Sequence, residues 1–292
     1  METLVGRLPD FLVIGAMKAG TTSMYHYVRA HPQVFMPAIK APEFFVAESN
    51  WTRGVDWYAK LFAPAGTDVE AVGEVSNAYT KYPQHRGVSE RVASCIPDVR
   101  LIYVVRDPIE RIRSHYRTRA REGAEKAPIE RAVFDNPIYL DFCRYAMQLD
   151  RYLEHFPREQ LLVITAEDLR GDRRATMRTV YGFLGIDPGF VPADLDREFY
   201  RTDDQPGRSL VPLRIRKGLK KHFPAAKRAK ELENNVFRRL KRQPRPSRGD
   251  ASAARPAEIS DDVRARIAQA LSEDVGRLRG FLGPTFDGWG IG

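Results

Sequence analysis

The chain has 292 residues, of which 43% are hydrophobic, enough for one large α/β domain with a substantial core. Its formal net charge is +9, and no stretch approaches the ~20 apolar residues of a membrane span. The first residues also lack the apolar region of a signal peptide, and residues 1–9 are too short and too mixed for a targeting segment. The two cysteines, Cys95 and Cys143, are typical of buried, reduced thiols.

The first element carries the most informative motif. Residues 11–14 form an apolar run of strand length, a turn rich in glycine and hydroxyl side chains follows, and residues 24–30 have a helical pattern. Such a helix start favours an anion. Gly15 and Gly20 keep the spacing of a nucleotide-triphosphate loop, but Thr21 stands where that loop has its lysine, which is displaced to Lys18. This arrangement suits a phosphosulfate without a metal ion. A plain strand-to-helix turn is the alternative.

A second motif lies at the end of the apolar run 101–105. Arg106 follows it, Asp107 can cap the next helix, and Pro108 suits its first turn. We expect a helix over residues 109–119, with Ser114 about two turns along it. Arg106 and Ser114 can then converge on one phosphate as donors. The alternative is a helix cap and a solvated serine.

The order of elements predicts the fold. Strand-like runs at 11–14, 71–72, 101–105 and 161–165 alternate with helical patterns. This alternation is typical of βαβ units. We therefore predict an α/β protein with a P-loop-like open parallel β-sheet flanked by helices on both faces. Residues 138–156 carry an apolar stripe at helical spacing, and residues 177–184 carry another, which ends at Gly185.

Residues 211–248 differ in kind, because they contain fourteen lysines and arginines against two glutamates. We expect a basic, partly mobile insertion at about 211–257 within a single domain of residues 1–292. Three interpretations compete for it: a solvated surface segment, a lid over an anionic ligand, and contact with an anionic membrane surface. A C-terminal helix is predicted at about 259–282, with Ser260 as its cap.

Two other classes of function compete with a sulfuryl transferase. A P-loop kinase would use the same fold, but Lys18 is displaced and no strand ends in a clear magnesium aspartate. A nucleic-acid-binding protein would explain the sequence pI of about 9.6. However, the basic run has few interleaved aromatic residues and no recognisable binding module around it. We therefore expect no nucleic-acid partner.

These motifs together resemble the sulfotransferases that use 3′-phosphoadenosine-5′-phosphosulfate (PAPS), above all bacterial relatives of the heparan sulfate N- and 3-O-sulfotransferases. The resemblance covers nearly the whole chain and rests on residues 15–23, 31–32, 40–45, 56–58, 73–76, 105–114, 161–169, 183–185 and the ending near Trp289. It implies PAPS as donor, no metal, and a small-molecule, glycan or glycolipid acceptor. It also implies direct in-line transfer. The eukaryotic relatives are anchored in the Golgi, and because this sequence shows no such anchor we expect a cytoplasmic bacterial enzyme. The oligomeric state stays open.

The resemblance also implies the roles of individual residues. Lys18 would be the catalytic cation on the bridging oxygen, and Arg106 with Ser114 would bind the 3′-phosphate. Gly207 and Arg208 resemble a loop that closes over the donor. The 5′-phosphosulfate would be held by the loop Lys18, Ala19, Gly20, Thr21, Thr22 and Ser23.

The chain departs from its relatives at the acceptor base. Where many of them have a glutamate, this chain has Ala41, and a glutamate appears two residues later as Glu43. Glu74 matches a second acidic position, and we favour it slightly over Glu43 as the base that deprotonates the acceptor. Glu43 is otherwise a solvated loop carboxylate, and Glu74 a buried partner of Lys18 or Lys40. His115 is expected to be structural.

Overall fold

The structure is a computed structural model that describes residues 6–197, 199 and 258–291. Contacts divide the chain into two units, one made of Met1–Asp204 and Ala257–Gly292 and the other of Gln205–Pro256. The predicted basic insertion at 211–257 and the pair Gly207 and Arg208 lie outside the described residues. The membrane contact and the closing loop therefore stay predictions. The cytoplasmic location, which the fold does not test, also stays a prediction.

A five-stranded parallel sheet forms the centre of the first unit, in the order β2-β3-β1-β4-β5. Its core strands are buried on both faces, as parallel strands covered by helices usually are. The sequence predicted four of the five strands and missed β2, which has only two residues. The strands are β1 (Phe11–Gly15), β2 (Val34–Phe35), β3 (Ala71–Val75), β4 (Arg100–Val105) and β5 (Leu161–Thr165).

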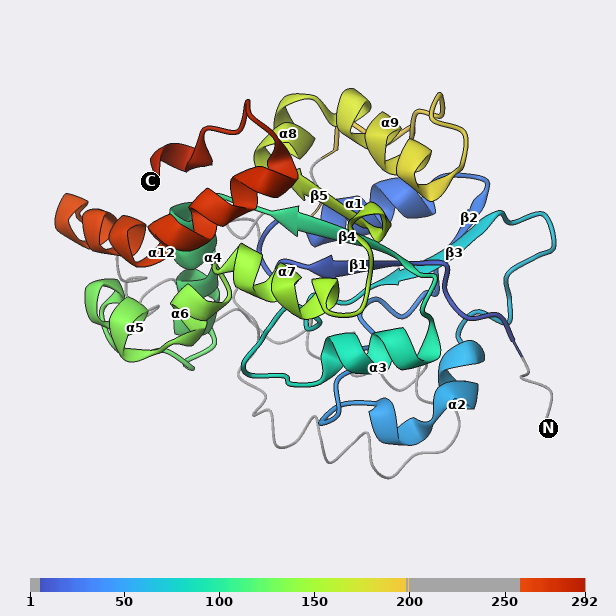
Figure 1. The fold of residues 1–292 in the computed structure, drawn as a ribbon, viewed down its shortest axis with the longest axis horizontal. Helices are drawn as coiled ribbons and strands as arrows, with labels where there is room; N and C mark the ends of the chain where they lie inside the picture. Colours follow the sequence, from blue (N-terminus) through green and yellow to red (C-terminus); the bar gives the residue numbers. More distant parts are fainter. Residues whose placement is uncertain (1–5, 198, 200–257, 292) are drawn as a thin grey trace, which may run out of the picture. The chain divides into compact units, whose positions relative to one another are not determined.

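Helices cover both faces of the sheet, which confirms the predicted fold class (Figure 1). On one face α1 (Thr21–Arg29) contacts α9 (Arg173–Leu184), next to α8 (Ala166–Gly171). On the other, α7 (Tyr145–Leu153) lies between α3 (Val88–Cys95) and α12 (Asp261–Leu282). The remaining helices are α2 (Val55–Ala59), α4 (Pro108–Arg121), α5 (Ile129–Asp135) and α6 (Ile138–Asp141). None of the helices within the described residues is long and apolar enough to cross a bilayer.

The apolar stripe predicted over residues 138–156 is mostly buried, but two helices carry it, because α6 ends at Asp141 and α7 begins at Tyr145. Buried Arg111 donates from Nη2 to the carbonyl oxygen of Tyr139 at 2.7 Å, so Cys143 N bonds instead to Leu140 O. Asp274 of α12 then accepts from the backbone amides of Ala146 and Met147, at 2.9 and 2.8 Å. Polar groups from other elements thus take the hydrogen bonds that a continuous helix would use.

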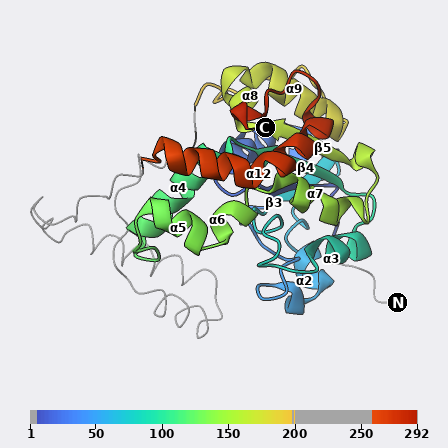
Figure 2. The same cartoon turned by 60° about the vertical axis from the view of Figure 1, so that its left-hand side comes forward.

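The predicted end of α9 and the predicted cap of α12 are confirmed, and one of the two predictions for the cysteines is wrong. Gly185, with φ 75°, ends α9, and the Ser260 side chain accepts from Val263 N at the start of α12, which Figure 2 shows alongside α4 and α7. Both cysteines are free, but only Cys143 is buried. The prediction of a buried Cys95 is therefore wrong.

Candidate active site

The turn between β1 and α1 depends on two glycines. Gly15 has φ 155°, and a Cβ there would collide with Oγ1 of Thr80, a hydroxyl that donates to the carbonyl of Ile14 at 3.1 Å. Gly20 has φ 93° and caps α1 without a side-chain hydrogen bond. The first amides of an α-helix have no acceptor within the helix, so this turn presents them to the space in front of it. The first turn of α1 contains no acidic residue.

Lys18 stands in this turn with a left-handed backbone, φ 74°. Its carbonyl oxygen accepts from Nη1 of Arg106 at 3.1 Å, and its ammonium donates to Oγ1 of Thr118 at 2.7 Å. Burial lowers the pKa of Lys18 below its usual value, and the nearby carboxylate of Glu122 opposes this effect. The lysine is therefore held at its backbone and at the tip of its side chain.

Two of the three hydroxyls of the loop, those of Thr22 and Ser23, have partners inside the protein. Thr22 Oγ1 accepts from the ammonium of Lys40, whose pKa burial lowers to about 8. Ser23 Oγ donates to the carbonyl of Phe199 at 3.2 Å and accepts from its amide at 3.3 Å. Thr21 is buried. The side chain of Ser23 therefore bonds residue 199 in this structure, and its role toward a ligand stays a prediction.

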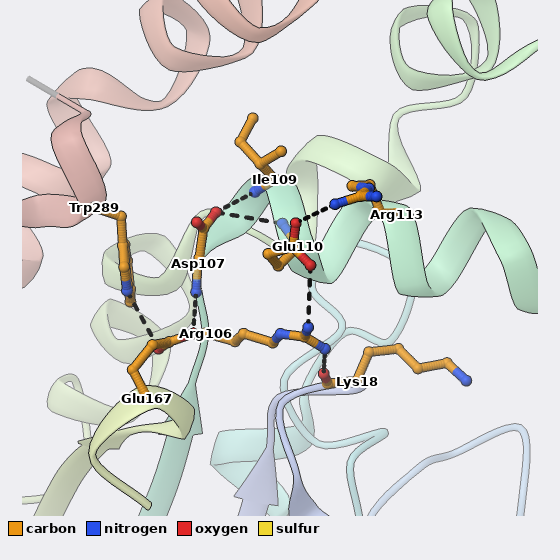
Figure 3. A network of polar contacts seen from close by, with 8 residues as sticks. All are labelled: Lys18, Arg106, Asp107, Ile109, Glu110, Arg113, Glu167 and Trp289. Atoms are coloured by element: carbon orange, nitrogen blue, oxygen red, sulfur yellow. Dashed lines mark hydrogen bonds and ion pairs between the residues drawn. The ribbon is translucent and has the colours of Figure 1, made fainter. Parts of the chain in front are cut away.

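Arg106 is the first residue after β4, and its guanidinium points across the turn toward Lys18 (Figure 3). Its Nη2 lies 3.4 Å from Glu110 Oε2, and the other oxygen of Glu110 lies 2.6 Å from Arg113 Nη1. Arg106 Nε is buried and has no hydrogen-bond partner within the described part of the chain. A buried donor of this kind is available for a ligand oxygen.

The predicted start of α4 is confirmed. Asp107 accepts from the backbone amides of Ile109 and Glu110, at 2.7 and 3.3 Å, and Pro108 opens the first turn. Ser114, 8% exposed, follows two turns later on the same helix. The strand end and the helix thus bring Arg106 and Ser114 to one cavity, as their spacing predicts.

A second set of contacts supports this turn from behind. Glu167 Oε1 accepts from Asp107 N, and its Oε2 accepts from the indole Nε1 of Trp289, both at 3.3 Å (Figure 3). Tyr145 donates to the carbonyl of Arg106 at 2.6 Å and packs edge-on against Trp289, with ring centroids 6.1 Å apart. The sequence analysis missed Glu167, although a carboxylate just after β5 is at the sheet edge where ligands bind.

A cavity of about 950 Å³ opens between these elements. Its wall includes every described residue that the resemblance assigns to the donor: Lys18 to Ser23, Arg106 and Ser114. The described lining carries nine lysines and arginines against two glutamates, so the cavity strongly favours anions. The cations that the sequence analysis did not single out for the donor site are Lys40, Lys81, Arg113, Arg117, Arg119, Arg170 and Arg173.

Glu74 lies in β3 and is 1% exposed. Its Oε1 accepts from the hydroxyls of Tyr58 and Tyr79, at 3.1 and 2.6 Å, so its partners are tyrosines rather than Lys18 or Lys40. Its Oε2 is buried and has no partner within the described residues. Burial raises the pKa of Glu74 to about 7. Glu74 is not among the described residues that line the cavity.

Glu43 belongs to the segment between β2 and α2 and has φ 51°. Its backbone amide donates to Ser76 Oγ at 3.1 Å, and its Oε2 accepts from Ser49 Oγ at 3.2 Å. Burial lowers the pKa of Lys81 in the cavity wall, and the negative charge of Glu43 opposes this effect. Glu43 is half-buried and is not among the described residues that line the cavity.

His115 also lines the cavity, but burial lowers its pKa to about 2. Its ring packs against Tyr139 and Phe142, with ring centroids 4.9 and 6.1 Å away. A histidine that stays neutral and is packed in this way is consistent with the structural role expected for it.

Comparisons with known proteins agree on one family. A model of the sulfotransferase domain matches residues 8–200. Human bifunctional heparan sulfate N-deacetylase/N-sulfotransferase 3 is 30% identical over 208 residues, which cover 65% of this chain and 24% of that protein. Human heparan sulfate glucosamine 3-O-sulfotransferase 3B1 is 29% identical over 189 residues, which cover 62% and 47%. The chain thus spans about a quarter to a half of these relatives.

The crystal structure of a sulfotransferase from Alicyclobacillus acidocaldarius superimposes with a TM-score of 0.67 at 24% identity. The alignment covers 97% of this chain and 99% of that one. At this identity the likeness concerns the fold, and it agrees with the parallel sheet and flanking helices described above.

Replacing Glu74 by Gln should change how stability depends on pH. The folded protein keeps the Glu74 proton up to about pH 7, whereas an unfolded glutamate loses it near ~4.3. The folded state binds more protons between these values, so this carboxyl contributes stability at low pH that is lost as pH rises through about 7. Between about pH 5 and about pH 8, E74Q should gain roughly 2–3 kcal/mol relative to the native chain.

Urea unfolding at both pH values measures this difference. Exposed Glu159 provides the control, because E159Q should follow the native chain at both. A difference between E74Q and the native chain that does not vary with pH would show that Glu74 is already ionised in the folded protein.

Proposed function

This chain belongs to the sulfotransferase family, and from that premise we propose that it transfers a sulfuryl group from PAPS to a hydroxyl or amine of a glycan acceptor. The names of the relatives support a glycan acceptor. The observation that carries the donor assignment is the cationic cavity in which the start of α1, Arg106 and Ser114 converge.

The residues present fit such a donor. The first amides of α1 and the Lys18–Ser23 turn would hold the 5′-phosphosulfate, as helix starts hold anions. Arg106, whose buried Nε has no partner among the described residues, and Ser114 would hold the 3′-phosphate. PAPS supplies an activated sulfuryl group on a phosphate oxygen. The sulfur–oxygen bond to that phosphate breaks as the acceptor oxygen or nitrogen bonds to sulfur.

Lys18 would stabilise the charge that develops on the departing phosphate oxygen. Its ammonium lies in the cavity wall and is fixed by Thr118, so little reorganisation is needed when charge appears. Burial strengthens its interaction with an anion, because water screens the charge less there.

Glu43 is the better candidate for the base that takes the acceptor proton. A general base must come within hydrogen-bond reach of the acceptor. Glu74 is 1% exposed and is bound by two tyrosine hydroxyls, whereas Glu43 is half-buried and its negative charge acts on Lys81 of the cavity wall. We therefore propose Glu43 as the base, although the sequence slightly favours Glu74, and we assign to Glu74 the role of a buried support of β3.

Binding of 3′,5′-adenosine bisphosphate, the spent donor, tests the donor site. Isothermal titration should give micromolar affinity that does not depend on magnesium. R106Q should weaken it roughly 10–100-fold, because hydrogen bonds to a charged partner are lost. R131Q is the control, since Arg131 is an exposed arginine of α5 away from the cavity. Magnesium-dependent binding of ADP, with none of the bisphosphate, would reject the PAPS assignment.

Lys18→Met should separate turnover from donor affinity. Methionine keeps the length of the side chain and removes its charge, so transition-state stabilisation is lost and turnover should fall roughly 100–1,000-fold. Affinity for the bisphosphate should stay within roughly threefold, since other groups hold its phosphates. Transfer of labelled sulfate from PAPS to N-desulfated heparan sulfate measures turnover. Equal losses of affinity and turnover would make Lys18 a binding residue only.

The two glutamates can be ranked in the same assay. E43Q removes the proposed base and should lower turnover roughly 100-fold or more. E74Q should lower it less than roughly tenfold, because Glu74 acts through packing. Circular dichroism and bisphosphate binding show whether each variant is folded. The opposite ranking, with both variants folded, would return the role of base to Glu74.

A further inference from the structure

The ammonium of Lys18 has one hydrogen-bond partner that no motif identified. It donates to Oγ1 of Thr118 at 2.7 Å, across 100 residues of sequence. Thr118 lies in α4, one turn beyond Ser114, and lines the same cavity as Lys18.

The direction of this hydrogen bond is fixed by the helix. Thr118 Oγ1 donates its single hydrogen to the carbonyl of Ser114 at 3.0 Å. Toward Lys18 the hydroxyl can therefore only accept, and an ammonium can only donate. The lone pairs of Thr118 are thus aimed at the place where the Lys18 nitrogen lies.

The other end of Lys18 is held by the same part of the chain. Arg106, which directly precedes the cap of α4, donates to the Lys18 carbonyl at 3.1 Å. The backbone and the tip of Lys18 are therefore both held by the segment from Arg106 to Thr118, which also contains the two residues proposed to bind the 3′-phosphate. A lysine side chain left free would sample many rotamers, and each bond of this kind restricts that sampling.

We propose that Thr118 is a positioning residue, which holds the ammonium of Lys18 in the cavity at the place where the departing oxygen of the donor is stabilised. This inference rests on the proposed function, and it does not require Thr118 to touch the donor. A threonine within a helix often bonds the carbonyl four residues earlier without any further role. In that case its replacement would leave Lys18 and turnover unchanged.

Two variants isolate the hydroxyl. Thr118→Val keeps the shape of the side chain and removes the acceptor, whereas Thr118→Ser keeps the acceptor. The first measurement is acylation of Lys18 by acetic anhydride as a function of pH, followed by mass spectrometry of the full-length protein after digestion. The hydrogen bond that Thr118 Oγ1 accepts from Lys18 favours the charged ammonium, so T118V should move the titration of Lys18 to lower pH. T118S should resemble the native chain, and Lys40 serves as an internal reference.

The second measurement is cleavage of PAPS in a single turnover, with N-desulfated heparan sulfate or water as acceptor. T118V should slow cleavage about tenfold, while bisphosphate affinity stays within about twofold and T118S restores the native rate. An unchanged or faster rate in T118V, or an unchanged titration of Lys18, would overturn the positioning role. A native chain that neither binds the bisphosphate nor cleaves PAPS would instead reject the proposed function, and the acylation measurement would still decide whether Thr118 holds Lys18.

Discussion

The hydrogen bond from Arg106 to the carbonyl of Lys18 is the contact on which the candidate site depends. It joins the turn after β1 to the turn after β4, two strands that are neighbours in the sheet. Because the strands are parallel, both turns lie at the same edge, and the strand order leaves a crevice there. The Arg106 guanidinium, which would bind the donor's 3′-phosphate, is thereby hydrogen-bonded to the backbone of Lys18, which would act at the donor's sulfate.

Charge and burial act together in this crevice. The described lining of the cavity contains nine lysines and arginines, and burial lowers the pKa values of Lys18, Lys40 and Lys81 among them. Such a concentration of like charge is unfavourable by itself, and an anionic ligand relieves it. The repulsion among these cations lowers the stability of the empty protein, and an anion that binds in the cavity removes part of it.

The sequence predicts the parts of the site that depend on neighbours in the chain. Gly15 ends β1, Lys18 and Gly20 lie in the turn after it, and Arg106 is the first residue after β4, so the local pattern places them at the sheet edge. Contacts across long stretches of sequence were not predictable: Thr118 lies 100 residues from Lys18, and Trp289 lies 122 from Glu167. The break between α6 and α7 has the same origin, because Arg111 and Asp274 come from elsewhere. The burial of Glu74, on which the proposal of Glu43 as base rests, is likewise a property of the whole fold.

The Trp289–Glu167 contact has a consequence for how the protein is made. A chain that emerges from the ribosome in order has its sheet, Lys18 and Arg106 available long before Trp289. The support behind the Asp107 amide cannot be complete until Trp289 has been added. The nascent protein would therefore have an incompletely supported crevice until Trp289 has left the ribosome and its indole can reach Glu167.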